Sequence, residues 1–211
     1  MADETIDFAS MLCSRLCHDL LSPVGSFGNG LELLADEHEP EMQKRCIELL
    51  ESSARIAINR LKYFRLAFGS AGGYGDSLSV VDLREALGGQ VPDGRDVAIN
   101  WIGDDTALPK AAARVLLLLA MSVIDALVRG GQIDVAVERR GETLELALRG
   151  EGPRVVIDSA SAAMFASDNE PLTPKTVPIA LARKMARDHS GDIMLSRPDD
   201  IGIVVGAILA I

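Results

Sequence analysis

The stretch Leu16-Cys17-His18-Asp19-Leu20-Leu21-Ser22-Pro23 places a histidine beside an acid, and a proline five residues after the histidine. Around this stretch, apolar residues recur at positions 13, 17, 20, 24, 27, 31 and 34. These alternating steps of four and three residues predict one long amphipathic helix. Inside such a helix, Pro23 deprives the carbonyl of Asp19 of its partner and crowds it, which costs roughly 3 kcal/mol. A chain tolerates that cost more readily where a bend is useful, and this bend falls within two turns of His18.

The composition excludes several classes of protein. The 211 residues are 48% hydrophobic, enough for a sizeable core, and carry a formal net charge of −10, which argues against nucleic acid as a partner. The longest apolar runs, such as 115–121, are too short to span a bilayer, and the acidic N-terminus is unlike a signal peptide. Cys13, Cys17 and Cys46 lack the further ligands of a metal site and are interpreted as small buried apolar residues. We therefore expect a cytoplasmic protein that meets neither nucleic acid nor membrane.

A second helix is predicted after the break at Asp36-Glu37-His38-Glu39-Pro40, because Pro40 suits the first turn of a helix and the apolar pattern resumes up to Phe68. A two-helix hairpin cannot bury the wide apolar face of this helix, whereas two hairpins paired as a four-helix bundle can, so we predict a homodimer. The alternative is that the second half of the chain covers the spare face. The apolar residues of that face are Cys46, Ile47, Leu49, Leu50, Ile56, Ile58, Leu61 and Phe64.

The glycine-rich run 69–75 predicts a flexible joint between two domains, 1–70 and 76–211. In the second domain we expect strands at 78–81, 97–101, 132–138, 143–149, 193–196 and 203–209, and helices at 110–128 and 179–189, the latter capped by Gly191. The predicted fold class is therefore α + α/β. An N-terminal antiparallel helical hairpin precedes an α/β sandwich whose helices lie on one side of a mixed sheet.

His18 is the candidate reactive residue. It lies one position off the apolar stripe, on a flank with Ser14, Arg15, Leu21, Ser22 and Gly25, most of which are small or polar. A histidine side chain titrates near ~6.5, so an exposed imidazole offers an uncharged nitrogen nucleophile that can accept a phosphoryl group and give it away. An incidental surface histidine is the alternative. Asp19 either polarises this imidazole, orients a partner's groups, or is a plain solvated acid.

Basic residues of the second helix are expected near His18. A hairpin that turns near residue 38 places His18 level with residue 59, in a region without acids between Glu51 and Asp76. Its basic and polar residues, which could meet an acidic partner, are Arg55, Asn59, Arg60, Lys62 and Arg65. The alternative is that these cations complement the C-terminal end of the helix dipole.

His18, Asp19, Ser22 and Pro23 resemble the phosphoacceptor box of sensor histidine kinases, and the order of elements after it resembles their ATP-binding domain. Three parts of the nucleotide site depart from that resemblance. Asp125 stands where these kinases have an asparagine, Leu148 replaces the aspartate that reads adenine, and 174–178 lacks the glycines of the phosphate lid. Glycine lets backbone amides approach phosphate closely, and two prolines here remove amides, so we expect no ATP binding.

Together with Asn29-Gly30-Leu31-Glu32-Leu33-Leu34, the box resembles the histidine phosphotransferase family of bacterial phosphorelays, most closely the ChpT type of the alphaproteobacterial cell-cycle pathway. The resemblance implies a homodimer in which His18 relays phosphate from the receiver aspartate of a hybrid histidine kinase to response regulators. It makes Asp19 a supporting acid and Pro23 the helix bend. It implies no cofactor or metal bound by this chain, with Mg²⁺ held by the partner receiver. The residues that it suggests for receiver docking are Arg15, Leu21, Ser22, Gly25, Asn59, Arg60 and Tyr63.

Two other functions stay open at this stage. One is an atypical ATP-dependent histidine kinase. The other is a dimeric, non-catalytic adaptor that binds receiver domains through an inert His18.

Overall fold

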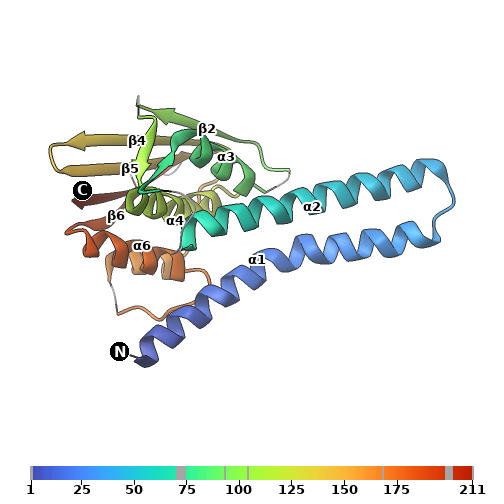
Figure 1. Cartoon of the computed structure of the whole chain (residues 1–211), viewed down its shortest axis with the longest axis horizontal. Coiled ribbons are helices and arrows are strands. Elements are labelled where there is room, and N and C mark those ends of the chain that lie inside the picture. The colour runs from blue at the N-terminus through green and yellow to red at the C-terminus, as the bar shows by residue number, and fades with distance from the viewer. Residues whose placement is uncertain are drawn as a thin grey trace.

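A computed structural model describes residues 2–69, 75–92, 94–103, 105–167, 169–197 and 202–210, with side chains described from residue 6 onward. A long helical hairpin projects from an α/β domain (Figure 1). Its first helix, α1, spans Ala2–Asp36, and the second, α2, spans Pro40–Phe68 with Pro40 in its first turn. The predicted hairpin and its turn are confirmed. The predicted domain boundary remains a prediction, because residues 70–74 lie outside the described part of the chain.

α1 continues through Pro23 and changes direction part-way along its length (Figure 1). Its buried positions in this region are Asp19, Pro23 and Gly30, and they form the face toward α2. A Cβ atom on Gly30 would lie 2.9 Å from Cδ2 of Leu50, so the absence of a side chain there lets the two helices approach closely.

Several residues of the apolar stripe of α1 are exposed to solvent. Val24 is 57% exposed, and Phe27 and Leu31 are also exposed. The α/β domain covers the C-terminal end of α2, where Tyr63 and Phe64 are buried, but further along α2 Ile58 remains 52% exposed. The alternative in which the second half of the chain covers the whole spare face is therefore wrong for these residues.

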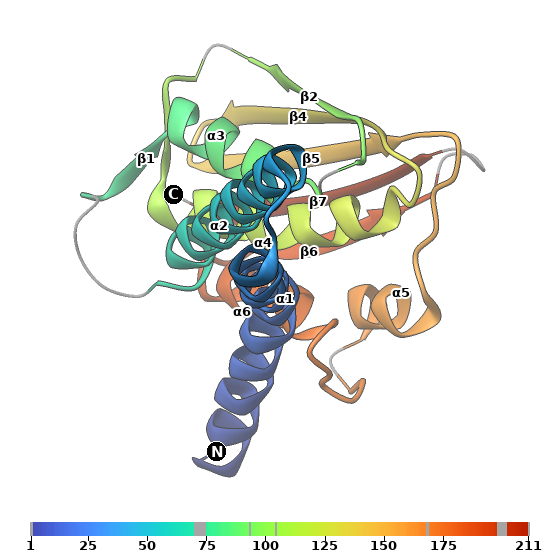
Figure 2. The same ribbon diagram turned by 90° about the vertical axis from the view of Figure 1, so that its right-hand side faces the viewer.

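The α/β domain is one mixed sheet covered by helices on one face, as the sequence predicts (Figure 2). The strand order is β2-β4-β5-β7-β6; the β2–β4 pair is parallel and the other pairs are antiparallel. A separate antiparallel pair joins β1 to β3. The elements are β1 Ser77–Ser79, α3 Val80–Gln90, β2 Val97–Ile102, β3 Ala107–Pro109, α4 Lys110–Ala126, β4 Gly131–Arg140, β5 Thr143–Glu151, α5 Ser159–Ala166, α6 Val177–Asp188, β6 Asp192–Ser196 and β7 Gly202–Ala210.

α4 is apolar around most of its circumference because it is enclosed on several sides. It packs against β5 and β7 of the sheet, against α6, and against α2 of the hairpin. Its residues Leu116 to Leu119 are fully buried, which a surface helix with a single apolar stripe would not require. The buried hydroxyl of Tyr63 on α2 donates a hydrogen bond to the backbone oxygen of Leu117 on α4. The hairpin is thus seated on the central helix of the α/β domain.

Two details of the sequence-based prediction are wrong, and a third, the Gly191 cap, is met with Ser190 in the left-handed position. The strand predicted over 78–81 ends at Ser79, whose hydroxyl accepts a hydrogen bond from the amide of Asp82 and starts α3. At the end of α6, Ser190 adopts the left-handed conformation, with φ at 53°, while the amide of Gly191 closes the turn on the oxygen of Ala186. Only Cys46 is buried; Cys13 and Cys17 are exposed.

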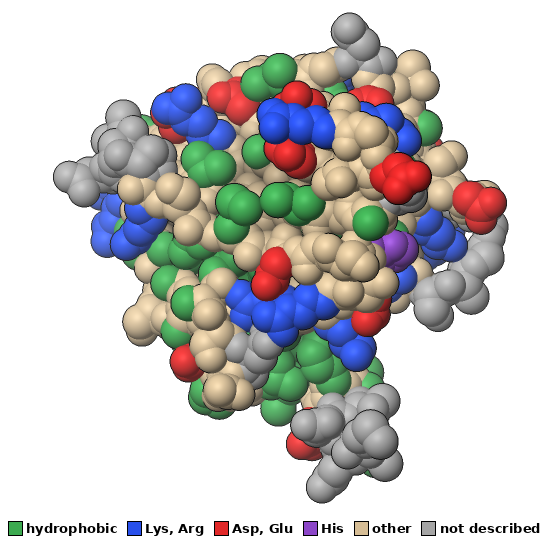
Figure 3. Space-filling view, turned by 90° about the vertical axis from the view of Figure 1, so that its left-hand side faces the viewer, with side chains coloured by type: hydrophobic (Ala, Val, Ile, Leu, Met, Phe, Trp, Pro, Cys, Tyr) green, Lys and Arg blue, Asp and Glu red, His purple; other side chains and the backbone are tan. Residues whose placement is uncertain are grey.

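On the face opposite the hairpin tip, acidic and basic side chains are interspersed with small apolar patches (Figure 3). Among the described residues, no helix combines the length and apolarity that crossing a membrane requires.

Candidate functional site

His18 stands on an open flank of α1. Its side chain is 83% exposed, and Leu21, Ser22 and Gly25 lie exposed on the same flank. A Cβ atom built on Gly25 would meet no other atom within 4 Å, so this flank of α1 is also open two turns beyond His18. A partner protein can therefore reach the ring.

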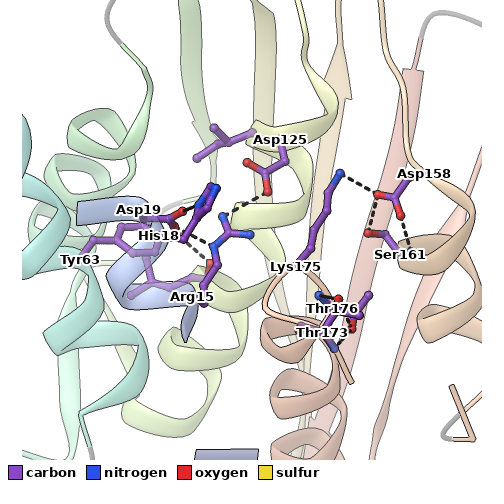
Figure 4. Close-up of polar contacts among 12 residues, drawn as sticks. Arg15, His18, Asp19, Tyr63, Asp125, Asp158, Ser161, Thr173, Lys175 and Thr176 are labelled. Atoms are coloured by element: carbon purple, nitrogen blue, oxygen red, sulfur yellow. Dashed lines mark hydrogen bonds and ion pairs between the residues drawn. The ribbon is translucent and has the colours of Figure 1, made fainter. Parts of the chain in front are cut away.

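Asp19 lies beneath the imidazole and contacts it (Figure 4). Its Oδ1 lies 3.0 Å from Nδ1 of His18, while the carboxylate itself is buried. A carboxylate oxygen can only accept a hydrogen bond, so this contact favours the ring tautomer that carries its proton on Nδ1. In the neutral ring the lone pair is then on Nε2, the nitrogen that does not contact Asp19. Of the interpretations open for Asp19, the plain solvated acid is wrong.

Arg15 holds the same carboxylate from the other side. Its Nε donates to Oδ2 of Asp19 at 2.7 Å, and its Nη2 donates to Oδ2 of Asp125 on α4 at 3.2 Å. Burial disfavours the charged guanidinium, but the carboxylates of Asp125 and Asp19 outweigh it and raise the pKa of Arg15 above its ordinary value. The site is therefore built from both halves of the chain.

The carbonyl that Pro23 leaves without a helical partner is satisfied from α2. Pro23 has no N–H for the backbone oxygen of Asp19, and Nη1 of Arg60 donates to that oxygen instead. This contact also places residue 60 of α2 beside residue 19 of α1, as the hairpin geometry predicts. The backbone oxygen of Asp19 therefore joins the bend in α1 to α2, through its hydrogen bond from Arg60.

The structure corrects part of the predicted docking set. Tyr63 is fully buried against α4, where burial raises the pKa of its phenol far above the ordinary value, so it cannot contact a partner. Arg15 is buried in its ion pairs. Asn59 is half-buried against Gly89 of α3, and Arg60 is half-buried on Asp19. Leu21, Ser22 and Gly25 are exposed beside His18, and their role in docking stays a prediction.

Asp125 is the site residue that sequence reasoning missed. The sequence marks it only as a departure from the nucleotide site of kinases, because 110 residues separate it from Arg15 and no periodicity links them. The available signal is the spacing of Arg15 and Asp19, which stand one helical turn apart and suit an ion pair. That pair indicates a buried charge cluster without naming its third member.

Asp125 and Lys175, which come from two of the segments that depart from the kinase pattern, border the same small cavity. The cavity bordered by Ser122, Asp125, Asp158 and Lys175 has a volume of only about 10 Å³. Nζ of Lys175 lies 2.8 Å from Oδ2 of Asp158. The hydroxyls of Thr173 and Thr176 form a hydrogen bond with each other (Figure 4). Leu148 is fully buried in the core.

Residues 80–201, more than half of the chain, match the family model described as the histidine phosphotransferase C-terminal domain. The chain belongs to the histidine phosphotransferase family. The protein phosphotransferase ChpT of Brucella abortus (strain 2308) is 36% identical over 137 residues. That match covers 63% of this chain and 62% of the relative, so the chain spans less than two thirds of the curated protein's length. The predicted resemblance to the ChpT type is confirmed.

Solved structures agree with this membership. A bacterial phosphotransferase determined at 1.7 Å resolution superposes with a TM-score of 0.81 and 26% identity, and the match covers 96% of each chain. The histidine kinase ThkA, in complex with the response regulator protein TrrA, superposes with a TM-score of 0.52 at 15% identity, over 99% of this chain and 63% of that one. The second match shows only that this chain shares its fold with a histidine kinase.

Asp158 provides a test of how its ion pair with Lys175 stabilises this part of the α/β domain. Burial alone would raise the pKa of its carboxyl, but hydrogen bonds from Lys175 and Ser161 outweigh burial and hold the pKa well below the ordinary value. A carboxyl whose pKa is depressed by folding adds stability above about pH 4, and this stability is lost as pH falls further. In Asp158→Asn the amide oxygen can still cap α5, but the side chain cannot ionise. We therefore expect a lower free energy of unfolding at pH 7. The decrease should be at most about 1 kcal/mol, because the Asp158–Lys175 pair is partly exposed.

Urea unfolding of wild type and Asp158→Asn from pH 7 to pH 3 measures this difference, which should shrink toward pH 3. Glu142→Gln, an exposed change in the β4–β5 turn, is the control and should follow wild type throughout. A difference that stays constant with pH would contradict the assignment of Asp158.

Proposed function

We propose that this protein relays a phosphoryl group through His18, from the receiver aspartate of a hybrid histidine kinase to the receiver aspartate of response regulators. The observation that carries the proposal is an exposed imidazole whose Nδ1 is held by a buried carboxylate, in a chain of the histidine phosphotransferase family. The kinase ThkA, which shares the fold, forms a complex with a response regulator, and this supports receiver domains as the class of partner. The cytoplasmic setting expected from the sequence stays a prediction.

In the accepting step, Nε2 of His18 attacks the phosphorus of an aspartyl phosphate. The N–P bond forms as the bond from phosphorus to the carboxyl oxygen breaks, and the partner's aspartate leaves as a carboxylate. In-line attack needs the ring nitrogen within about 3 to 3.5 Å of phosphorus, which the 83% exposed side chain of His18 allows. No proton leaves Nε2, because the Nδ1 tautomer presents a lone pair there.

Asp19 stabilises the charge that this step creates. Attack by a neutral ring gives an imidazolium, whose Nδ1–H points at Oδ1 of Asp19. In the donating step the same ring leaves phosphorus and becomes neutral again, while the phosphorus is taken by a second receiver's carboxylate. The fixed carboxylate of Asp19 stabilises the charged, phosphorylated ring whether phosphate is being accepted or donated. This arrangement suits a relay that runs in both directions.

The Mg²⁺ that neutralises the phosphoryl oxygens would come with the receiver and its own acidic pocket. The two carboxylates near His18 fit this assignment, because Asp19 and Asp125 are both already paired with Arg15. This chain would contribute the nucleophile and the docking surface, and no cofactor of its own.

Transfer is proposed to proceed without ATP. Small-molecule sites commonly have volumes of roughly 300–1,000 Å³. The cavity bordered by Asp125 and by the Lys175–Asp158 ion pair is about 10 Å³, and we propose that it corresponds to the nucleotide site of kinases. Asp125 at this position also carries negative charge, which disfavours a triphosphate.

The active form is proposed to be a homodimer. The exposed apolar residues Val24, Phe27 and Leu31 of α1 repeat in steps of three and four, and Ile47, Ile58 and Leu61 form a similar stripe on α2. Two such hairpins bury both stripes when they pair as a four-helix bundle. His18 lies one position off the α1 stripe, so pairing leaves it accessible.

The role of His18 is tested by phosphotransfer from a receiver domain labelled with ³²P by acetyl phosphate. We expect label on wild type and on His38→Gln, whose histidine lies exposed in the hairpin turn, and none on His18→Gln. Asp19→Asn should slow transfer by about tenfold or more, the factor given by one charge-assisted hydrogen bond of roughly 1.5 kcal/mol. Equal labelling of His18→Gln and wild type would favour a non-catalytic adaptor.

The dimer is tested by light scattering of Val24→Lys/Ile58→Lys. Burying one such apolar side chain contributes roughly 1.5 to 3 kcal/mol to dimer stability, and a lysine in its place adds an unpaired charge. This variant should therefore have the mass of one chain, while wild type should have twice that mass. Val81→Lys is the matched control on α3, away from both stripes, and should stay dimeric. A wild-type protein that remains a single chain at every concentration would contradict the bundle.

Equilibrium dialysis against labelled ATP with Mg²⁺ tests the filled nucleotide region. We expect no saturable binding at micromolar concentrations, with an intact histidine kinase as the positive control. Micromolar affinity, together with label on His18 from γ-labelled ATP, would favour an ATP-dependent kinase instead.

A further inference from the structure

Asp125 contacts the His18 site from the α/β domain, yet no step of the proposed chemistry uses it. It stands in the last turn of α4, where its side chain is 38% exposed, and it borders the small cavity that also contains Asp158 and Lys175. A surface aspartate with no further role would be free to stay in solvent. Here it is the outer partner of a buried arginine.

Three contacts in series connect Asp125 to the imidazole (Figure 4). Asp125 Oδ2 lies 3.2 Å from Nη2 of Arg15, Nε of Arg15 lies 2.7 Å from Oδ2 of Asp19, and Oδ1 of Asp19 lies 3.0 Å from Nδ1 of His18. Each contact uses a different atom, so no oxygen or nitrogen is shared between two partners. The series runs from the α/β domain to the reactive ring without a gap.

The arrangement constrains the plane of the Asp19 carboxylate. A guanidinium is planar and presents its N–H groups in a fixed fork, so pairing at both ends restricts its rotation. The cavity behind it is small, about 60 Å³, and it is bordered by Arg15, Arg60, Gln90, Met121 and Asp125. With Oδ2 of Asp19 held by Nε of Arg15, Oδ1 is directed at the imidazole.

We propose that Asp125 and Arg15 are positioning residues, through which the α/β domain sets the tautomer and orientation of the His18 ring. The inference rests on the proposed phosphotransfer function and assigns the α/β domain a task within it. Where a kinase uses this region for nucleotide, this chain uses an aspartate of the same region to align the phosphoacceptor. Receiver docking alone would not need this contact.

The tautomer of His18 is measured by NMR of ¹⁵N-histidine protein at a pH where the ring is neutral, with His18→Gln identifying the signals among the three histidines. A neutral imidazole without a partner on Nδ1 distributes its proton over both nitrogens. We expect wild type to hold the proton mainly on Nδ1. In Asp125→Ala the Nε2–H form should increase, and transfer from a labelled receiver should slow by about fivefold, the ratio given by one exposed ion pair.

Two further variants separate positioning from simple stability. Tyr63→Phe removes the hydrogen bond to Leu117, another contact between the hairpin and α4, and should change neither the tautomer nor the transfer rate. Asp125→Glu keeps the carboxylate, so its His18 tautomer and its transfer rate should be close to those of wild type. Because Asp125 is partly exposed, Asp125→Ala is expected to fold, and its melting curve checks this.

The tautomer measurement tests the positioning role, and the transfer assay tests the proposed function. One can therefore be contradicted without the other. A wild-type protein that takes no phosphate but whose His18 tautomer responds to Asp125→Ala would overturn the proposed function and leave the positioning contact standing. Normal transfer with a tautomer that is the same in wild type, Asp125→Ala and Asp125→Glu would overturn the positioning role alone. A response to Tyr63→Phe as large as that to Asp125→Ala would also overturn it.

Discussion

Arg15 lies between two carboxylates that come from different halves of the chain, and the geometry of the site depends on this double ion pair. An arginine so deeply buried is unfavourable unless its charge is compensated, and Asp19 alone supplies only one partner. Asp125 supplies the second from α4. The hairpin can therefore place His18 on an open flank while the acid beneath it remains fixed.

Pro23 imposes the second constraint. A proline in the middle of α1 leaves one backbone oxygen without a helical partner, and an unsatisfied buried carbonyl costs about 1 to 3 kcal/mol. The oxygen is that of Asp19, and Arg60 of α2 donates to it. The bend thus leaves a backbone oxygen that binds the second helix, one residue from His18. This contact explains how α1, a helix of 35 residues, accommodates Pro23 in its interior.

The sequence predicts the architecture well because its strongest patterns are local. The apolar periodicity of the hairpin, the break at Pro40 and the alternation of β4 and β5 each depend on residues close in the chain. The prediction fails where local and distant contacts compete. Ser79 ends a strand by capping a helix, and Tyr63 is buried because α4 packs on it, which no pattern within α2 reveals. His18 could be singled out from its motif, whereas Asp125 could not, because the Arg15–Asp125 pair joins residues 110 positions apart.

The most direct test of the proposed chemistry is the identity of the ring nitrogen that carries phosphate. A carboxylate on Nδ1 leaves Nε2 as the nucleophile, so the geometry predicts a single phosphohistidine isomer. ³¹P and ¹⁵N NMR of the ¹⁵N-histidine protein, phosphorylated by a receiver domain, should show the phosphorus bonded to Nε2 of His18. Phosphorus bonded to Nδ1, or to another residue, would contradict this chemistry.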